Sequence, residues 1–107
     1  MEIKILWTDF AKSAVRSIFN YYLENVSRNL ARKLVVGIVA ETKQLQYQPT
    51  MGTLEPLLEK DPKSFRYILY KSYKIIYWIN EDRRAIEIVD VFDSRQNPIK
   101  ITKGTLK

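Results

Sequence analysis

Residues 64–79 read SFRYILYKSYKIIYWI, two runs of β-forming residues separated by the polar pair Lys71-Ser72. Ile, Tyr, Phe and Trp dominate both runs, and a similar run returns in residues 84–92 after Glu81-Asp82. Apolar runs with such brief polar breaks are typical of consecutive β-hairpins. The C-terminal half of the chain therefore predicts three antiparallel strands, over residues 64–70, 73–79 and 84–92.

Two tight turns would fix which residues of this sheet face each other. The first turn places Arg66 opposite Tyr77, and the second places Tyr77 opposite Ile86. One face then carries Arg66, Ile68, Tyr70, Tyr73, Ile75, Tyr77, Ile79, Ile86, Ile88 and Phe92, and the other carries Phe65, Tyr67, Leu69, Lys74, Ile76, Trp78, Ala85, Glu87, Val89 and Val91. Both faces of the predicted sheet are strongly apolar.

Apolar residues in the N-terminal half recur instead at steps of three and four, the spacing of amphipathic helices. One series is Phe10, Ala14, Val15, Ile18, Tyr22 and Val26, and the next is Leu30, Ala31, Leu34, Val35, Ile38, Thr42 and Leu45. Thr8 and Ser27 stand where N-caps are needed. We predict an antiparallel helical hairpin over residues 8–47, preceded by a short strand at residues 2–7.

The other segments are less regular. A connector at residues 50–63 contains Pro56 and Pro62, so we expect at most a short turn in it, and the polar tail, residues 93–107, adds at most one edge segment. The length of 107 residues suits one domain, residues 1–107. The predicted fold class is α+β: an N-terminal strand and an antiparallel helical hairpin packed on one face of a small antiparallel β-sheet.

Two helices can cover only one face of such a sheet. The second apolar face would remain in water, beyond what a monomer usually tolerates. The tail, a second copy of the chain in a homodimer, or a different protein could cover it. The tail has few apolar residues, so we favour a partner protein that lays a helix or strand on this face.

The composition excludes several chemistries. The chain has no Cys and no His, which excludes disulfides, thiolate or imidazole metal sites and a Ser-His-Asp triad. We expect no metal and no cofactor. The net charge of +6 suits an anionic partner, although the charges are scattered and form no continuous stripe. With no leader segment and no long apolar run, we expect a cytoplasmic protein without membrane contact.

The order of these blocks resembles the RelE/ParE superfamily of toxins from bacterial type II toxin–antitoxin modules. The sheet carries the likeness most specifically, in Arg66-Tyr67-Ile68-Leu69, Tyr73-Lys74-Ile75-Ile76-Tyr77 and Ile86-Glu87-Ile88-Val89-Asp90-Val91. The helices add an acidic start at Asp9, an Ile-x-x-Tyr block ending at Tyr21 and the closure Leu45…Pro49…Gly52. The resemblance implies a growth-inhibiting toxin that is neutralised by a cognate antitoxin protein.

The superfamily divides into ParE-like poisons of DNA gyrase and RelE-like endonucleases that cut messenger RNA on the ribosome. Residues 93–98, DSRQNP, resemble the ending of the ParE side. No Tyr follows Tyr77, and Phe65 and Tyr67 stand where the RelE-like enzymes place two lysines. We therefore favour the ParE-like interpretation, which requires no catalysis. A metal-independent ribosome-dependent endonuclease is the alternative, followed by a basic nucleic-acid-binding module or an inactive toxin homologue.

The candidate site residues follow from these two interpretations. In the ribonuclease alternative, the candidates for catalysis are Arg66, Lys74 and Arg95, since cations would stabilise the developing phosphate charge. Candidates for contact with the target or the antitoxin are Tyr67, Lys74, Trp78, Arg95, Gln96 and Asn97. Arg66 also has a structural interpretation, as a cation that bonds to a carbonyl, and Lys74 has one as a solvated strand lysine.

Overall fold

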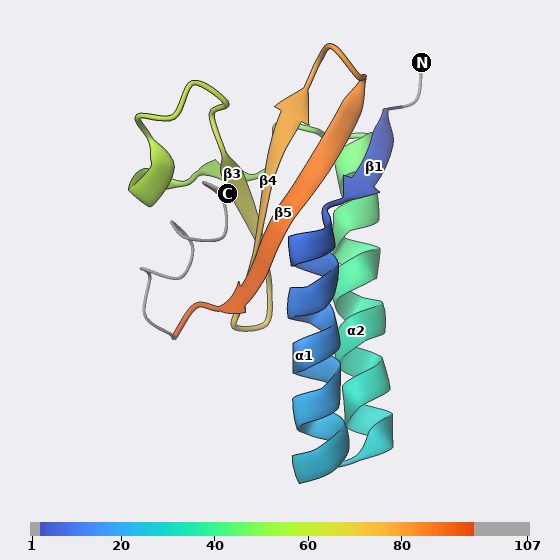
Figure 1. Ribbon diagram of the computed structural model, residues 1–107. Coiled ribbons are helices and arrows are strands. Elements are labelled where there is room, and N and C mark those ends of the chain that lie inside the picture. Colours follow the sequence, from blue (N-terminus) through green and yellow to red (C-terminus); the bar gives the residue numbers. More distant parts are fainter. Residues whose placement is uncertain (1–2, 96–107) are drawn as a thin grey trace.

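Two helices lie side by side against one face of a five-stranded sheet in the computed structural model, which describes residues 3–95 (Figure 1). The chain runs through β1 (Lys4–Trp7), α1 (Asp9–Asn25), α2 (Arg28–Lys43), the 3-10 helix η1 (Gln44–Gln46), β2 (Thr53–Leu54), the 3-10 helix η2 (Pro56–Leu58), β3 (Arg66–Tyr70), β4 (Tyr73–Asn80) and β5 (Ala85–Asp93). The predicted α+β architecture with a helical hairpin is confirmed.

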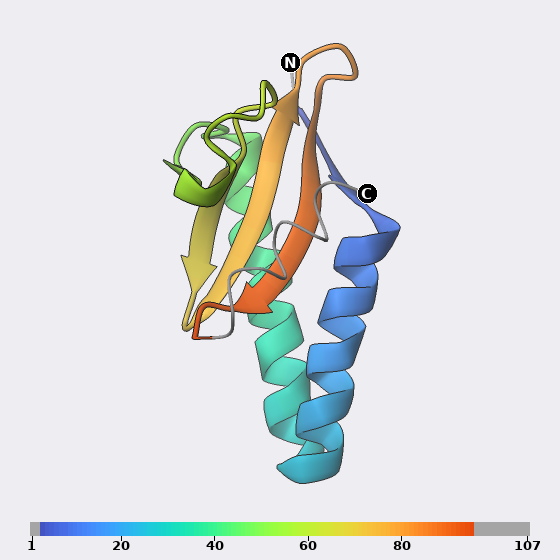
Figure 2. The same ribbon diagram turned by 60° about the vertical axis from the view of Figure 1, so that its left-hand side comes forward.

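The helices begin at the predicted caps. The Thr8 hydroxyl accepts a hydrogen bond from the Ala11 N–H at 3.1 Å, and the Ser27 hydroxyl accepts one from the Leu30 N–H at 3.1 Å. Ala11, Leu34 and Ile38 are buried against the sheet. The far ends of both helices extend past the end of the sheet, as Figures 1 and 2 show.

The sheet has the strand order β1-β5-β4-β3-β2 and is mixed. All neighbouring pairs are antiparallel except β1 and β5, which run parallel. The three predicted antiparallel strands are confirmed, and the N-terminal strand, whose pairing was not predicted, joins the sheet parallel to β5. A parallel pair needs a long crossover, and the helical hairpin with β2–β4 supplies it here.

The first hairpin has the predicted register, with Arg66 opposite Tyr77. The second hairpin does not: Tyr77 lies opposite Ile88, not Ile86, because residues 81–84 form a longer loop than expected, with Arg84 at a φ of 49°. A β-bulge follows, in which β5 contributes Val89 as an extra residue.

The bulge also changes which side chains face the helices. Val91 belongs to the core beneath the helices, while Phe92 packs at the opposite face of the sheet. The sequence-based prediction had these two residues the other way round, since a strand without a bulge alternates strictly.

The face of the sheet away from the helices, hereafter the outer face, is partly covered by the connector between β2 and β3. Leu58 and Phe65 of this connector are buried against Ile76 and Val89. The sequence analysis did not predict that the connector covers this face, because its two prolines indicated only an irregular loop. Leu57 and Leu69 are nonetheless 53% and 52% exposed, so apolar surface remains in water.

The contact between α2 and β3 generates a stability prediction. Gly37 lies so close to the Tyr70 ring that any Cβ at position 37 would overlap the ring atoms Cζ and Cε1. We expect Gly37→Ala to lower the free energy of unfolding by about 1 kcal/mol, because the cost of moving the ring exceeds the helix propensity that Ala gains over Gly. Chemical denaturation would measure this. In a Tyr70→Leu background the same substitution should cost much less, and an equal cost in both backgrounds would contradict the prediction.

Candidate functional site

Tyr67 and Lys74 lie together on the outer face, as predicted. The Lys74 Nζ is 4.1 Å from the centroid of the Tyr67 ring, which is close enough for a cation–π interaction. The same Nζ is 3.1 Å from Oε1 of Glu55, whose side chain is fully buried. Lys74 is therefore paired with a carboxylate of the connector and is not a freely solvated strand lysine.

Glu55 joins the connector to the sheet through both carboxylate oxygens. While Oε1 accepts from Lys74, Oε2 accepts from the Leu57 N–H at 3.1 Å and so caps η2. A buried carboxylate needs such partners, since an uncompensated charge is costly in the interior. The pair Glu55–Lys74 fixes the connector over the outer face.

Trp78 is half-buried on the same face, next to a different cation. The Lys63 Nζ lies 5.5 Å from its ring centroid. Trp78, Lys63 and Arg66 border a mostly polar hollow of about 400 Å³. Trp78 thus offers an aromatic surface at the edge of the connector.

Arg66 is turned toward the loop at residues 50–52. Its Nη1 donates to the Gly52 carbonyl at 2.8 Å and to the Thr50 carbonyl at 3.4 Å. The loop is also held by the buried Tyr77 hydroxyl, which accepts from the Gly52 N–H at 3.0 Å and donates to the Pro49 carbonyl at 2.7 Å. These contacts agree with the carbonyl-bonding interpretation of Arg66. Burial raises the pKa of Tyr77.

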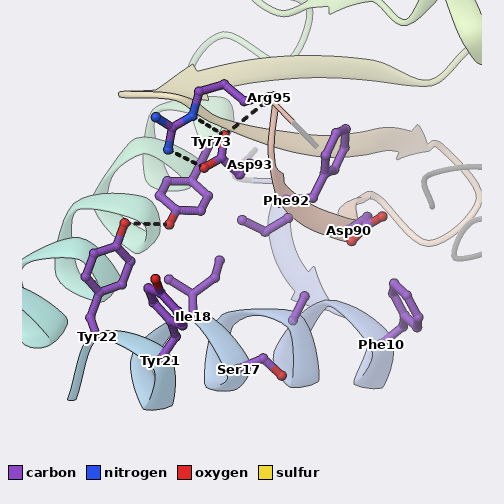
Figure 3. Close-up of a pocket in the computed structure, with 12 residues that line it drawn as sticks. Phe10, Ser17, Ile18, Tyr21, Tyr22, Tyr73, Asp90, Phe92, Asp93 and Arg95 are labelled. Carbon is purple, nitrogen blue, oxygen red and sulfur yellow. Dashed lines mark hydrogen bonds and ion pairs between the residues drawn. The ribbon is translucent and has the colours of Figure 1, made fainter. Parts of the chain in front are cut away.

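A separate groove of about 540 Å³ lies between α1 and β5 (Figure 3). Its helix side includes Phe10, Ala14, Ile18 and Tyr21, and its strand side is formed by residues 90–93 with Arg95. Phe10 is 43% exposed and Tyr21 is 59% exposed, so part of the helix side is in contact with water.

Polar groups close one end of this groove. The Arg95 guanidinium binds Asp93 through two contacts, Nε to Oδ1 at 2.9 Å and Nη2 to Oδ2 at 2.6 Å, and the Arg95 N–H adds a third, to Oδ1 at 3.0 Å. The Tyr73 hydroxyl donates to the Tyr22 hydroxyl at 3.3 Å (Figure 3). The Arg95 guanidinium holds the pKa of Asp93 down at about 2 and has its own pKa raised by that carboxylate. Burial, followed by the bond to Tyr22, raises the pKa of Tyr73.

Asp90 lies on the strand side of the groove and is only 4% exposed. Burial raises the pKa of its carboxyl to about 6, while the adjacent Val91 N–H acts in the opposite direction. No ion pair within residues 3–95 compensates this carboxylate.

Residues 5–98 match the family described as "ParE toxin of type II toxin-antitoxin system, parDE". The chain belongs to this ParE toxin family. No curated protein matches the sequence significantly.

Solved structures agree with this family assignment in fold. A chain of the chromosomal ParDE toxin–antitoxin system from P. aeruginosa superposes with a TM-score of 0.70 at 20% identity, over 85% of this chain and 95% of that one. A mutant of the E. coli RelE toxin in the free state superposes with a TM-score of 0.58 at 13% identity, over 99% of this chain and 96% of that one. A chain of the RelBE2 toxin–antitoxin complex from Mycobacterium tuberculosis superposes with a TM-score of 0.57 at 12% identity, over 87% of this chain and 99% of that one.

The sequence-predicted site residues of this ParE family member do not form one cluster. Tyr67, Lys74 and Trp78 share the outer face, whereas Arg66 bonds to a loop and Arg95 borders the α1–β5 groove. Gln96 and Asn97 lie outside the described residues. Within residues 3–95 no cluster of metal-ligating side chains occurs, and no helix there is long and apolar enough to span a membrane.

Three acidic residues of the site were not predicted from the sequence. Glu55 precedes Pro56, and an acidic residue before a helical turn that begins with Pro is a recognisable cap signal. Asp90 interrupts the apolar run of β5, which was a signal of a special environment. Asp93 gave no local signal, because its partner depends on how the chain turns after β5.

The Glu55–Lys74 pair predicts that the stability of the protein depends strongly on Lys74. Lys74→Met leaves Glu55 buried without a counter-charge and should lower the free energy of unfolding by about 3 kcal/mol at neutral pH. The double variant Lys74→Met/Glu55→Gln should recover at least half of this loss, as urea denaturation would show. Lys71→Met, at an exposed turn lysine, is the control, and an equal loss in Lys71→Met and Lys74→Met would contradict the assignment.

Asp90 predicts a component of stability that increases as the pH falls. Its folded-state pKa is about 6 and therefore above the usual 3.8, so protonation favours the folded state. For an Asp90 without a cation beside it, the difference in unfolding free energy between Asp90→Asn and the natural chain should be about 3 kcal/mol in favour of Asn at pH 7.5 and should be almost lost near pH 4. A cation from beyond residue 95 that pairs with Asp90 would reduce this difference. The exposed Asp82→Asn is the control for this pH series. A difference that does not change with pH would contradict a buried Asp90 carboxylate without a cationic partner.

Proposed function

We propose that this chain is the toxin of a ParE-type pair, that it inhibits growth by binding DNA gyrase, and that a cognate antitoxin neutralises it. The family match over residues 5–98 carries this proposal. The antitoxin is the partner that the description of the family implies. DNA gyrase is the target that the ParE-like character of residues 93–98 favours.

The arrangement of the three candidate cations supports binding over RNA cleavage. Cleavage without a metal needs an acid, a base and free cations around one phosphate. Here Lys74 is paired with Glu55, Arg66 with the loop carbonyls and Arg95 with Asp93, at three different places. A set of this kind stabilises the protein itself and leaves no common point at which a phosphate would meet all three.

The outer face supports the antitoxin and target contacts. Tyr67 and Trp78 remain half-buried there, beside the exposed Leu57 and Leu69. Partly exposed aromatic side chains beside apolar surface are frequent anchors of a protein interface. We assign Tyr67 and Trp78 to this contact, and Lys74 holds the Tyr67 ring in place through the cation–π interaction.

Inducible expression in a bacterium tests the proposal. Growth arrest with an induced DNA-damage response, together with inhibition of purified gyrase supercoiling, is the expected result. Rapid loss of messenger RNA with cuts within codons would indicate the ribonuclease instead. Healthy growth despite confirmed soluble expression would refute both activities.

Two variants and a second gene sharpen this test. Trp78→Ala should weaken the growth arrest if the outer face binds the target. Tyr47→Ala should not weaken it, because Tyr47 follows η1 directly and is 76% exposed. Both variants must first show the natural thermal stability. Co-expression of the adjacent antitoxin gene should restore growth, and failure of every neighbouring gene to do so would contradict the pairing.

A further inference from the structure

The edge of β5 that borders the α1–β5 groove has no neighbouring strand over half its length. β1 pairs with β5 only as far as Ile88. There the Thr8 N–H and the Thr8 hydroxyl both donate to the Ile88 carbonyl at 3.0 Å, and the chain turns away into α1. Within residues 3–95 no strand lies along this edge beyond Ile88.

The backbone groups of this edge are oriented toward the groove. The Ser94 N–H donates to the Ser72 carbonyl at 2.7 Å, on the side of β4. Because backbone groups alternate along an antiparallel strand, those of Val91 and Asp93 face the other way. An extended segment placed in the groove would meet these groups on one side and the apolar side chains of Phe10, Ala14 and Ile18 on the other.

The charges of the groove define this segment further. Asp93 is already paired with Arg95, but Asp90 is 4% exposed and has no cationic partner among the described residues. A fitting occupant therefore has alternating apolar residues that face α1 and one basic residue that faces Asp90.

We propose that the occupant is the C-terminal segment of this same chain, residues 98–102. The sequence that follows Arg95 contains Pro98-Ile99-Lys100-Ile101-Thr102, and residues 96–107 include three lysines and no acidic residue. A three-residue loop over residues 94–96 is a common hairpin connection. It places Ile99 opposite Val91 and Lys100 opposite Asp90.

The position of the proline fits the same register. Pro98 falls opposite Phe92, whose backbone groups face β4, so this position requires no N–H donor from the segment. The segment also begins at the rim of the groove, at Arg95, and has no distance to bridge. A strand from an acidic partner would leave Asp90 without a counter-charge.

Hydrogen exchange by NMR on the purified full-length chain tests this pairing. The Val91 and Asp93 amides should exchange at least tenfold more slowly in the natural chain than in Ile101→Asp, which places a charge against α1. Leu106→Asp is the matched control and should leave both rates unchanged. Equal rates in the natural chain and in Ile101→Asp would overturn the proposal.

A charge exchange tests the register. Lys100→Glu should abolish the protection, Asp90→Lys/Lys100→Glu should restore it, and Lys107→Glu should have no effect. If Asp90→Lys does not fold, the effect of Lys100→Glu should instead shrink in an Asp90→Asn background. If the protection increases with protein concentration, the occupant of the groove is a second copy of the chain. If it appears only when an antitoxin is added, the occupant is a strand of that partner. Either result overturns the proposal, and neither depends on whether gyrase is the target.

Discussion

The central strand of this protein is apolar on both sides, and the rest of the structure follows from the need to cover it. Ile75, Ile76 and Tyr77 are consecutive residues of β4 and all are completely buried. Because successive side chains of a strand point to opposite faces, no single layer can shield them. The helical hairpin covers one face, and the connector, held by Glu55 and Lys74, covers part of the other.

The sequence predicted the parts of the fold that depend on local patterns. The helices begin at Thr8 and Ser27 because a hydroxyl at an N-cap acts over only three residues, and the tight turn at Lys71-Ser72 fixes the first hairpin. The second hairpin depends on the length of its loop and on the bulge at Val89, neither of which leaves a periodic signal. The register of the second hairpin could therefore not be predicted from the sequence.

The candidate site was predictable only as a set of residue types. Aromatic and basic side chains were expected on the outer face, and Tyr67, Lys74 and Trp78 are there. Their partners were not predicted, since Glu55 meets Lys74 across a separation of 19 residues and through an irregular connector. Long-range ion pairs of this kind turn apparent surface cations into structural ones, and a charge count cannot distinguish the two.

The bulge in β5 makes the length of this strand as important as its composition. Val89 is its one additional backbone unit. Deleting that unit would make the pairs Tyr77–Ile88 and Ile76–Asp90 consecutive, so the ladder would become regular and both Val91 and Phe92 would keep their present faces. The loss of codon 89 would thus remove one side chain of the outer face and straighten the strand, whereas the insertion of one residue after Asp90 would reverse the facing of every later position up to the last ladder pair.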